Sequence, residues 1–236
     1  MKKLIYLILI CVLPFLSSCR KFFGIEGNHN LTSESRYESG FSEIKSSSDI
    51  NVYIEQDSAF DIVVEAEENL LPYIETKLDH SCLEIEIKHG RNLINHYPIN
   101  VFVKGPYFSE ISLSGSGNII CDTLDYNNIY FKLSGSGDIS AVAYCDKTEV
   151  KISGSGKVTL SGQASQTDYK ISGSGKIKAF GMETGDAFCN ISGSGDIYVF
   201  VNDLLDVNIS GSGTVYYRGT PQVVVTISGS GKVIHD

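Results

Sequence analysis

The sequence predicts an all-β protein, a parallel β-helix or closely related β-solenoid with rungs of about 19 residues. The first observation is a four-residue word, Ser-Gly-Ser-Gly, which occurs seven times at intervals of 18 to 20 residues. The second is a fixed apolar frame, because the residue before each word and the second residue after it are always aliphatic. The third is the alternation of apolar and polar residues between words, as in "DIYVF" and "LDVNI", which is typical of strands.

The chain opens with a segment typical of an exported lipoprotein. Lys2 and Lys3 precede an apolar run from 4 to 16, which is shorter than the roughly 20 residues that span a bilayer. The following "LSSC" ends at Cys19 and resembles the lipobox of bacterial lipoproteins. The resemblance implies a signal peptide over 1–18 and acylation of the Cys19 thiol, and hence membrane contact through an N-terminal lipid. An ordinary signal peptide with a chance cysteine is the alternative.

The segments after the leader differ in composition. Residues 19–40 are polar and are predicted to form a flexible tether. Residues 41–110 contain alternating runs such as "INVYIEQ" and "INVFVKG", with one candidate for a short helix at 67–78. The letters "FSEI" at 41 recur at 108, so we interpret 41–110 as an irregular, β-rich opening of the stack that residues 111–236 continue.

The repeated word is interpreted as a structural corner. Fourteen of the 23 glycines lie in the seven words, although each glycine in extended structure costs about 0.5–1 kcal/mol relative to alanine. Such an accumulation indicates that the backbone geometry demands glycine. Counting by twos from Leu133 turns the serines outward and places these glycines inward: Gly115, Gly117, Gly135, Gly137, Gly154, Gly156, Gly173, Gly175, Gly193, Gly195, Gly211, Gly213, Gly229 and Gly231.

The outward side of these corners is the candidate binding face. It consists of the second serine of each word and the residue that follows the word, which in the central rungs are Ser136, Asp138, Ser155, Lys157, Ser174, Lys176, Ser194 and Asp196. Neighbouring rungs are expected to pair Asp138 with Lys157 and Lys176 with Asp196. A column of equivalent weak contacts suits an extended partner such as a glycan chain or a surface protein, or another copy of the chain in a homo-oligomer.

Other interpretations of the word fit the residues less well. A phosphate-binding loop needs Ser or Thr after Gly-Lys and then a helix, but Lys157 is followed by valine and a strand pattern. Calcium needs oxygen ligands where lysine stands at three of the seven corners. The formal net charge of −9 disfavours nucleic acid as a partner. No cofactor is therefore expected.

The sequence offers no catalytic or metal-binding pattern. From 111 onward it contains one arginine, Arg218, and one histidine, His235, whereas polysaccharide lyases and hydrolases need clustered carboxylates or basic residues. The five histidines show no ligand spacing. An enzyme is thus disfavoured, and neither catalytic nor metal-ligating residues are predicted.

Four cysteines lie beyond the leader, and no pair forms a C-x-x-C motif: Cys82, Cys121, Cys145 and Cys189. An exported protein can form disulfides. However, the slot of Cys189 is filled in other rungs by apolar residues such as Val150 and Val207, which favours a buried free thiol.

The combination of "FSEIKSSSDINVYIEQ", "VVEAEENLLPYIETKL", "INVFVKG" and "ISLSGSGNI" resembles the head GIN domain family, described as adhesins of auto-transporter type. The resemblance covers about 41–233. The resemblance implies a β-helical fold and a place in the cell envelope of Bacteroidetes-type bacteria. The family has no established catalytic residues that could be assigned to this sequence.

Two functions are favoured over a third, a cryptic enzyme. The first is a lipid-anchored binding module, an adhesin on the outer membrane. The second is a structural or assembly lipoprotein that faces the periplasm, which "CRKFFG" favours because it lacks the acidic run resembling a surface-export signal.

Overall fold

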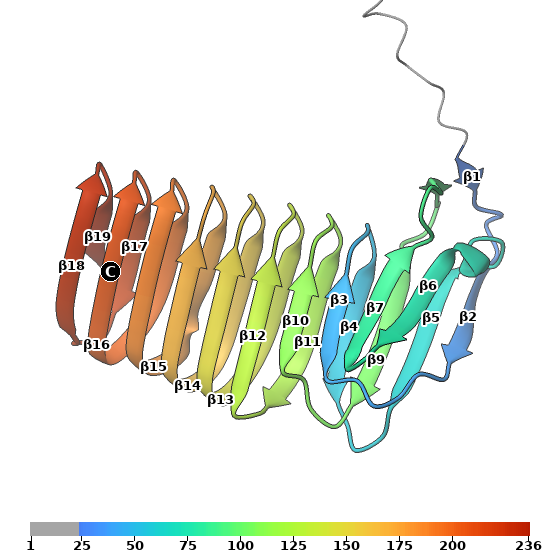
Figure 1. Cartoon of the computed structure of the whole chain (residues 1–236), viewed down its shortest axis with the longest axis horizontal. Coiled ribbons are helices and arrows are strands. Elements are labelled where there is room, and N and C mark those ends of the chain that lie inside the picture. The colour runs from blue at the N-terminus through green and yellow to red at the C-terminus, as the bar shows by residue number, and fades with distance from the viewer. Residues whose placement is uncertain (1–23) are drawn as a thin grey trace, which may run out of the picture.

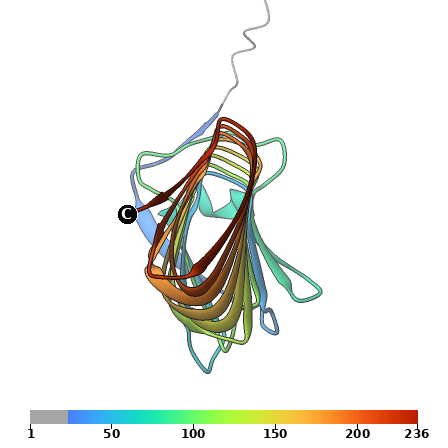
Figure 2. The same ribbon diagram turned by 90° about the vertical axis from the view of Figure 1, so that its left-hand side faces the viewer.

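The computed structural model describes residues 24–236 and shows a column of stacked, mostly parallel rungs (Figure 1). The predicted parallel β-solenoid is confirmed. Seen from the end of the column, the rungs nest inside one another as flattened loops that are narrow at the repeated word and wide at the opposite bend (Figure 2). The lipidation proposed for Cys19 and the signal peptide over 1–18 lie outside the described residues.

Each central rung consists of one long, bent strand. The strand starts after one word, runs along a back face, bends, and returns along a front face to the next word. Four strands have this form: β13 (Asp138–Ile152), β14 (Lys157–Ile171), β15 (Lys176–Gly193) and β16 (Asp196–Gly211). Elsewhere the two faces are separate strands: β10 (Glu110–Leu113), β11 (Asn118–Asp125), β12 (Asn128–Leu133), β17 (Thr214–Arg218), β18 (Gln222–Gly229) and β19 (Lys232–His235).

The register of the rungs turns the periodic sequence into columns of like residues. On the back face, Ile139 pairs with Val158, which pairs with Ile177. On the front face, Ile152 pairs with Ile171 in the same way. All five side chains are buried, and their columns form the hydrophobic core that runs the length of the stack. The apolar frame that flanks each word is therefore the core itself.

The words form tight turns that stack directly on one another. Their serines are exposed, whereas the second glycine of every word before the last is buried. A Cβ added at Gly173 would lie 2.6 Å from the carbonyl oxygen of Gly154 in the preceding rung. In the last three words the first glycine also has a positive φ, which is 150° at Gly193, 143° at Gly211 and 128° at Gly229. Close approach of backbones, with left-handed geometry added there, explains the glycines.

The N-terminal part joins the stack in an order that differs from the order of the chain. Strands β3 (Glu43–Ser46) and β4 (Asn51–Gln56) make the rung next to β10 and β11. The rung beyond is made by β7 (Cys82–Ile87) and β9 (Asn100–Gly105). Ile44 pairs with Ile111, so the two "FSEI" segments occupy equivalent positions in adjacent rungs.

Antiparallel strands cap this end of the column. Strand β5 (Asp61–Glu67) pairs with β9, β2 (Leu31–Arg36) pairs with β5, and β6 (Ile74–Asp79) pairs with β7. A short pair, β1 (Ile25–Glu26) and β8 (Leu93–Ile94), lies beside them. The expected tether over 19–40 is thus wrong for 25–36, because β1 and β2 are hydrogen-bonded parts of the fold.

The helix expected over 67–78 shrinks to a single 3₁₀ turn at Leu71–Tyr73. Pro72 lacks an N–H and can only serve the first turn of a helix. The residues after the turn alternate, with Ile74 and Thr76 buried, and therefore continue as strand β6 against β7.

The opposite end of the column is an open rung. Val223, Val225 and Ile227 occupy core columns but are 37–43% exposed in β18, whereas their counterparts in β16 are buried. In the described part of the chain, no helix is long and apolar enough to cross a membrane.

Candidate binding surface

The residues predicted as the binding face form a ladder along the back edge of the turns. Ser136, Ser155, Ser174 and Ser194 are exposed and repeat from rung to rung. The predicted charge pairing is confirmed: Nζ of Lys157 lies 2.7 Å from Oδ2 of Asp138, and Nζ of Lys176 lies 3.0 Å from Oδ2 of Asp196. The hydrogen bond to Asp196 also raises the pKa of the Lys176 ammonium. The ladder therefore presents hydroxyl groups and locally neutralised charges.

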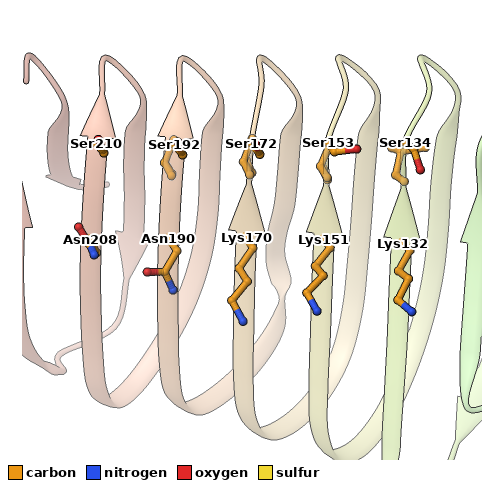
Figure 3. Close-up of a pocket in the computed structure, with 14 residues that line it drawn as sticks. Lys132, Ser134, Lys151, Ser153, Lys170, Ser172, Asn190, Ser192, Asn208 and Ser210 are labelled. Carbon is orange, nitrogen blue, oxygen red and sulfur yellow. The ribbon is translucent and has the colours of Figure 1, made fainter.

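A groove of about 530 Å³ follows the front edge of the same turns across five rungs (Figure 3). Two columns of polar side chains line it, with edges of buried aliphatic residues such as Ile152 and Ile171 between them. One column stands two residues before each word, and the other is the first serine of the word: Lys132, Lys151, Lys170, Asn190 and Asn208; Ser134, Ser153, Ser172, Ser192 and Ser210.

The lysines of the groove are paired with carboxylates of the same face. The Nζ–O distances are 2.7–2.9 Å for Lys132 with Glu110, Lys151 with Glu149, and Lys170 with Asp168. Lys170 also reaches Glu149 of the preceding rung at 3.4 Å. The hydrogen bond from Lys151 lowers the pKa of Glu149, although partial burial acts in the other direction. The groove is consequently a ladder of compensated charges rather than a strongly positive surface.

This groove was not among the surfaces predicted from the sequence. The signal was nevertheless present, because lysine or asparagine stands two residues before five consecutive words, in "KLSGSG", twice in "KISGSG" and twice in "NISGSG". The glycines and the residue after each word instead indicated the opposite edge of the turn as the binding face. A column of like side chains in a solenoid becomes visible only when each position of one repeat is compared with the same position in the other repeats.

A second hollow, of about 730 Å³, lies at the bend opposite the words. Its lining is acidic and irregular, since equivalent positions change from rung to rung: Tyr144, Gln163 and Glu183 follow one another. The back face carries two aromatic stacks, Tyr53 on Phe102 at 5.0 Å and Tyr198 on Tyr216 at 4.7 Å between ring centroids. Neither surface repeats over as many rungs as the groove.

All four cysteines beyond the leader are free in the structure. Burial raises the pKa of Cys189 and Cys121 far above the ordinary range and raises that of Cys82 and Cys145 to about 11. Cys189 lies in the apolar column between Tyr169 and Val207, as expected.

The histidines gave no ligand pattern in the sequence, but the fold brings two of them together. His29 and His96 flank the buried carboxylate of Glu67, with potential ligand atoms within 4.8 Å of one another. The expectation of no metal-ligating group therefore missed one such cluster among the described residues. Positions 29, 67 and 96 belong to three separate segments of the cap, so no spacing along the chain reports their proximity.

A family model described as "Putative auto-transporter adhesin, head GIN domain" matches residues 40–221. The chain belongs to this family. The match includes both the irregular opening and most of the repeats, so the head GIN domain is not confined to the SGSG segment. Adhesins act at the cell envelope, and the family description is that of an envelope-associated protein.

Solved structures share this head GIN fold. A putative adhesin from Bacteroides fragilis matches with a TM-score of 0.85 at 22% identity, over 89% of this chain and 99% of that chain. A putative lipid binding protein from Parabacteroides distasonis matches with a TM-score of 0.75 at 26% identity, over 89% and 99%. A putative adhesin from Parabacteroides merdae matches with a TM-score of 0.72 at 25% identity, over 90% and 99%. No curated protein is similar to the chain.

Proposed function

We propose that this head GIN protein is a lipid-anchored, adhesin-like module of the cell envelope that binds a linear glycan along the front groove. The observation that carries the proposal is repetition: five successive rungs present a Lys or Asn side chain and a serine hydroxyl at equivalent positions. A polymer of like units meets the same chemistry at each rung. A compact small molecule would use only a fraction of such a surface.

The chemistry of the groove favours sugar hydroxyls over other repetitive ligands. Serine hydroxyls donate and accept hydrogen bonds, lysine donates, and asparagine does both. Because Lys132, Lys151 and Lys170 are paired with carboxylates, a polyanion would find little uncompensated positive charge. An extended peptide presents one face every 6.6–6.8 Å or so, whereas rungs repeat at about 4.8 Å, so it would soon lose register.

The placement of the cap supports an anchor at the N-terminal end. Strands β1 and β2 lie at the capped end of the column, far from β18 and β19 (Figure 1). A lipid on Cys19 would hold this end near the membrane and leave the repeats directed away from it. Several weak contacts along the groove would then add, because each one raises the effective concentration for the next.

The alternative is a periplasm-facing structural or assembly lipoprotein of the outer membrane without adhesive binding. The residues after Cys19, which lack an acidic run, favour it. Proteolysis of intact cells separates the two locations: a surface adhesin is cleaved by added protease, whereas a periplasmic protein is protected until the outer membrane is opened.

Binding of the full chain to a panel of immobilised polysaccharides tests the groove. Single changes of Lys132, Lys151 or Lys170 to Gln are expected to weaken binding less than about tenfold, and the triple variant by about 100-fold or more. The control is the triple Ala variant of Asp138, Lys157 and Asp196, which removes three charges from the other edge of the turns. It should bind like the wild type.

Three other outcomes contradict parts of the proposal. Loss of binding in the control triple variant alone would assign the site to the ladder that the sequence favoured. Binding of surface proteins but of no polysaccharide would replace the glycan as partner. Absence of any binding, together with protection from protease, would favour the structural role.

A further inference from the structure

The cap contains a cluster of ionisable side chains that neither the fold nor the groove requires. His29 follows β1, Glu67 ends β5, and His96 lies in the loop between β8 and β9. The rings of His29 and His96 are 3.7 Å apart between centroids, with an angle of 35° between their planes. Glu26 stands beside them, with Oε1 3.8 Å from Nε2 of His96.

The carboxylate of Glu67 is the fixed centre of this cluster. Its side chain is fully buried, and it accepts the backbone N–H groups of His29 and His96, both at 2.7 Å. A Cβ on Gly27 would collide with it. These N–H groups and Nδ1 of His96 surround the carboxylate with hydrogen-bond donors, which favour its charged form. The carboxylate is thus a pre-formed, negatively charged anchor.

Glu67 also determines which nitrogen of His96 is free. Nδ1 of His96 lies 3.0 Å from Oε1 of Glu67. Because the carboxylate can only accept, Nδ1 donates to it, and Nε2, on the side of Glu26, is the nitrogen left for another partner. A carboxylate that holds one imidazole nitrogen while the other is free is the arrangement that surrounds histidine ligands of metal ions.

The distances fit a single small cation. Zinc binds imidazole nitrogen and carboxylate oxygen at about 2.0–2.2 Å, so two ligand atoms of one ion lie at most about 4.4 Å apart. Nε2 of His96 and Oε1 of Glu26, at 3.8 Å, are within this limit but too far apart for a hydrogen bond. His29 stacks on the same ring, and one of its ring nitrogens lies within 4.8 Å of a ring nitrogen of His96.

We propose that His29, His96 and Glu26 bind one Zn²⁺ ion, with Glu67 as the carboxylate that orients His96. Imidazole and carboxylate donors together suit zinc and related first-row ions. The bound ion would connect the start of the domain to the loop before β9 and so fasten the short β1–β8 pair to the cap. An ion that binds only the folded state would stabilise it against unfolding.

The test measures Zn²⁺ binding by the full chain, freed of metal with a chelator and then titrated in a calorimeter. We expect one ion per chain at the cluster, and a higher melting temperature with Zn²⁺ than with chelator because the ion binds only the folded state. Ca²⁺, which prefers oxygen ligands, should produce neither effect.

Two histidine variants form a matched pair. His29 and His80 both have left-handed backbones, with φ of 61° and 56°, and both are exposed. Asparagine tolerates this conformation, so His29→Asn and His80→Asn impose the same backbone change. We expect His29→Asn, like His96→Gln, to weaken zinc binding at the cluster at least tenfold, and His80→Asn to leave it unchanged.

The melting temperature of each variant in chelator separates a loss of zinc binding from a loss of folding stability. A purely structural role of the cluster would lower the metal-free melting temperature of His29→Asn without any difference in its response to zinc. Zinc bound by the cysteines would be equal in all variants. The proposal is wrong if the wild type takes up no stoichiometric zinc, or if His29→Asn and His96→Gln take up as much as His80→Asn.

Discussion

The inward position of the glycines makes a strong prediction about two adjacent residues of one turn. Gly175→Val and Ser174→Val introduce the same side chain one residue apart, in the middle of the column. An added Cβ at Gly175 would lie 2.6 Å from Cγ2 of Ile152 and 2.8 Å from the carbonyl oxygen of Gly156. Ordinary contacts of this kind are about 3.5–4.0 Å long, so the neighbours would have to move by nearly 1 Å.

The structure gives these neighbours little freedom to move. Ile152 is 1% exposed and packed in the core, and Gly156 accepts the N–H of Lys176 at 3.1 Å. Overpacking of a filled core costs about 1–3 kcal/mol, and loss of one backbone hydrogen bond adds about 1 kcal/mol. We therefore expect Gly175→Val to destabilise the protein by more than about 2 kcal/mol. Ser174→Val, at an exposed position, should change stability by less than about 1 kcal/mol.

Urea unfolding followed by circular dichroism measures both variants, with the slopes compared before midpoints are converted to free energies. Gly173→Val provides a replicate, because its Cβ would meet the carbonyl oxygen of Gly154. If Ser174→Val proves as damaging as Gly175→Val, the inward and outward sides of the turn are assigned the wrong way round. If neither variant is damaging, close packing of the turns is not the reason for the glycines.

Two further predictions concern the anchor and the thiols. Cys19→Ala should release the protein from membranes and abolish labelling by a fatty-acid analogue, and a wild type retained on membranes without label would contradict lipidation. In the native protein at pH 8, Cys121 and Cys189 should resist a thiol reagent, and Cys82 and Cys145 should react only slowly, because burial raises all four pKa values. All four should react in denaturant, and rapid labelling of Cys189 in the folded state would contradict its place in the core.

The part of the fold that could be predicted is the part that repeats. In a solenoid each rung buries its apolar residues only against its neighbours, so the same selection acts on every copy and the period survives in the sequence. The aliphatic residues around each word, such as Ile152 and Val158, reported the core for this reason. The long bent strands did not follow from the sequence, because no proline and no regularly placed glycine marks the bend: β15 has Gly185 there, whereas β13 has no glycine at all.

The cap could not be predicted because each of its strand pairings occurs only once and leaves no repeat in the sequence. Strands β3 and β4 precede β7 and β9 in the chain but lie between them and β10 in the stack. Alternating residues specify which face of a strand is buried, yet they do not specify which strand lies beside it. Strand β2 was predicted to be part of a tether because five of its six residues are polar or charged. It is ordered by its hydrogen bonds to β5, which the sequence does not reveal.

The repetition of the groove limits how precisely it can position a bound polymer. A ligand with the period of the rungs can slide by one rung and make the same contacts, so a uniform groove binds without fixing a register. The change from Lys170 to Asn190 removes this equivalence, because a shift across that boundary exchanges an ammonium group for an amide. A neutral chain meets only donors at the lysines but both donors and acceptors at the asparagines, so its contacts also change at the boundary. The position at which a bound polymer stops is therefore set by the residues that break the repeat.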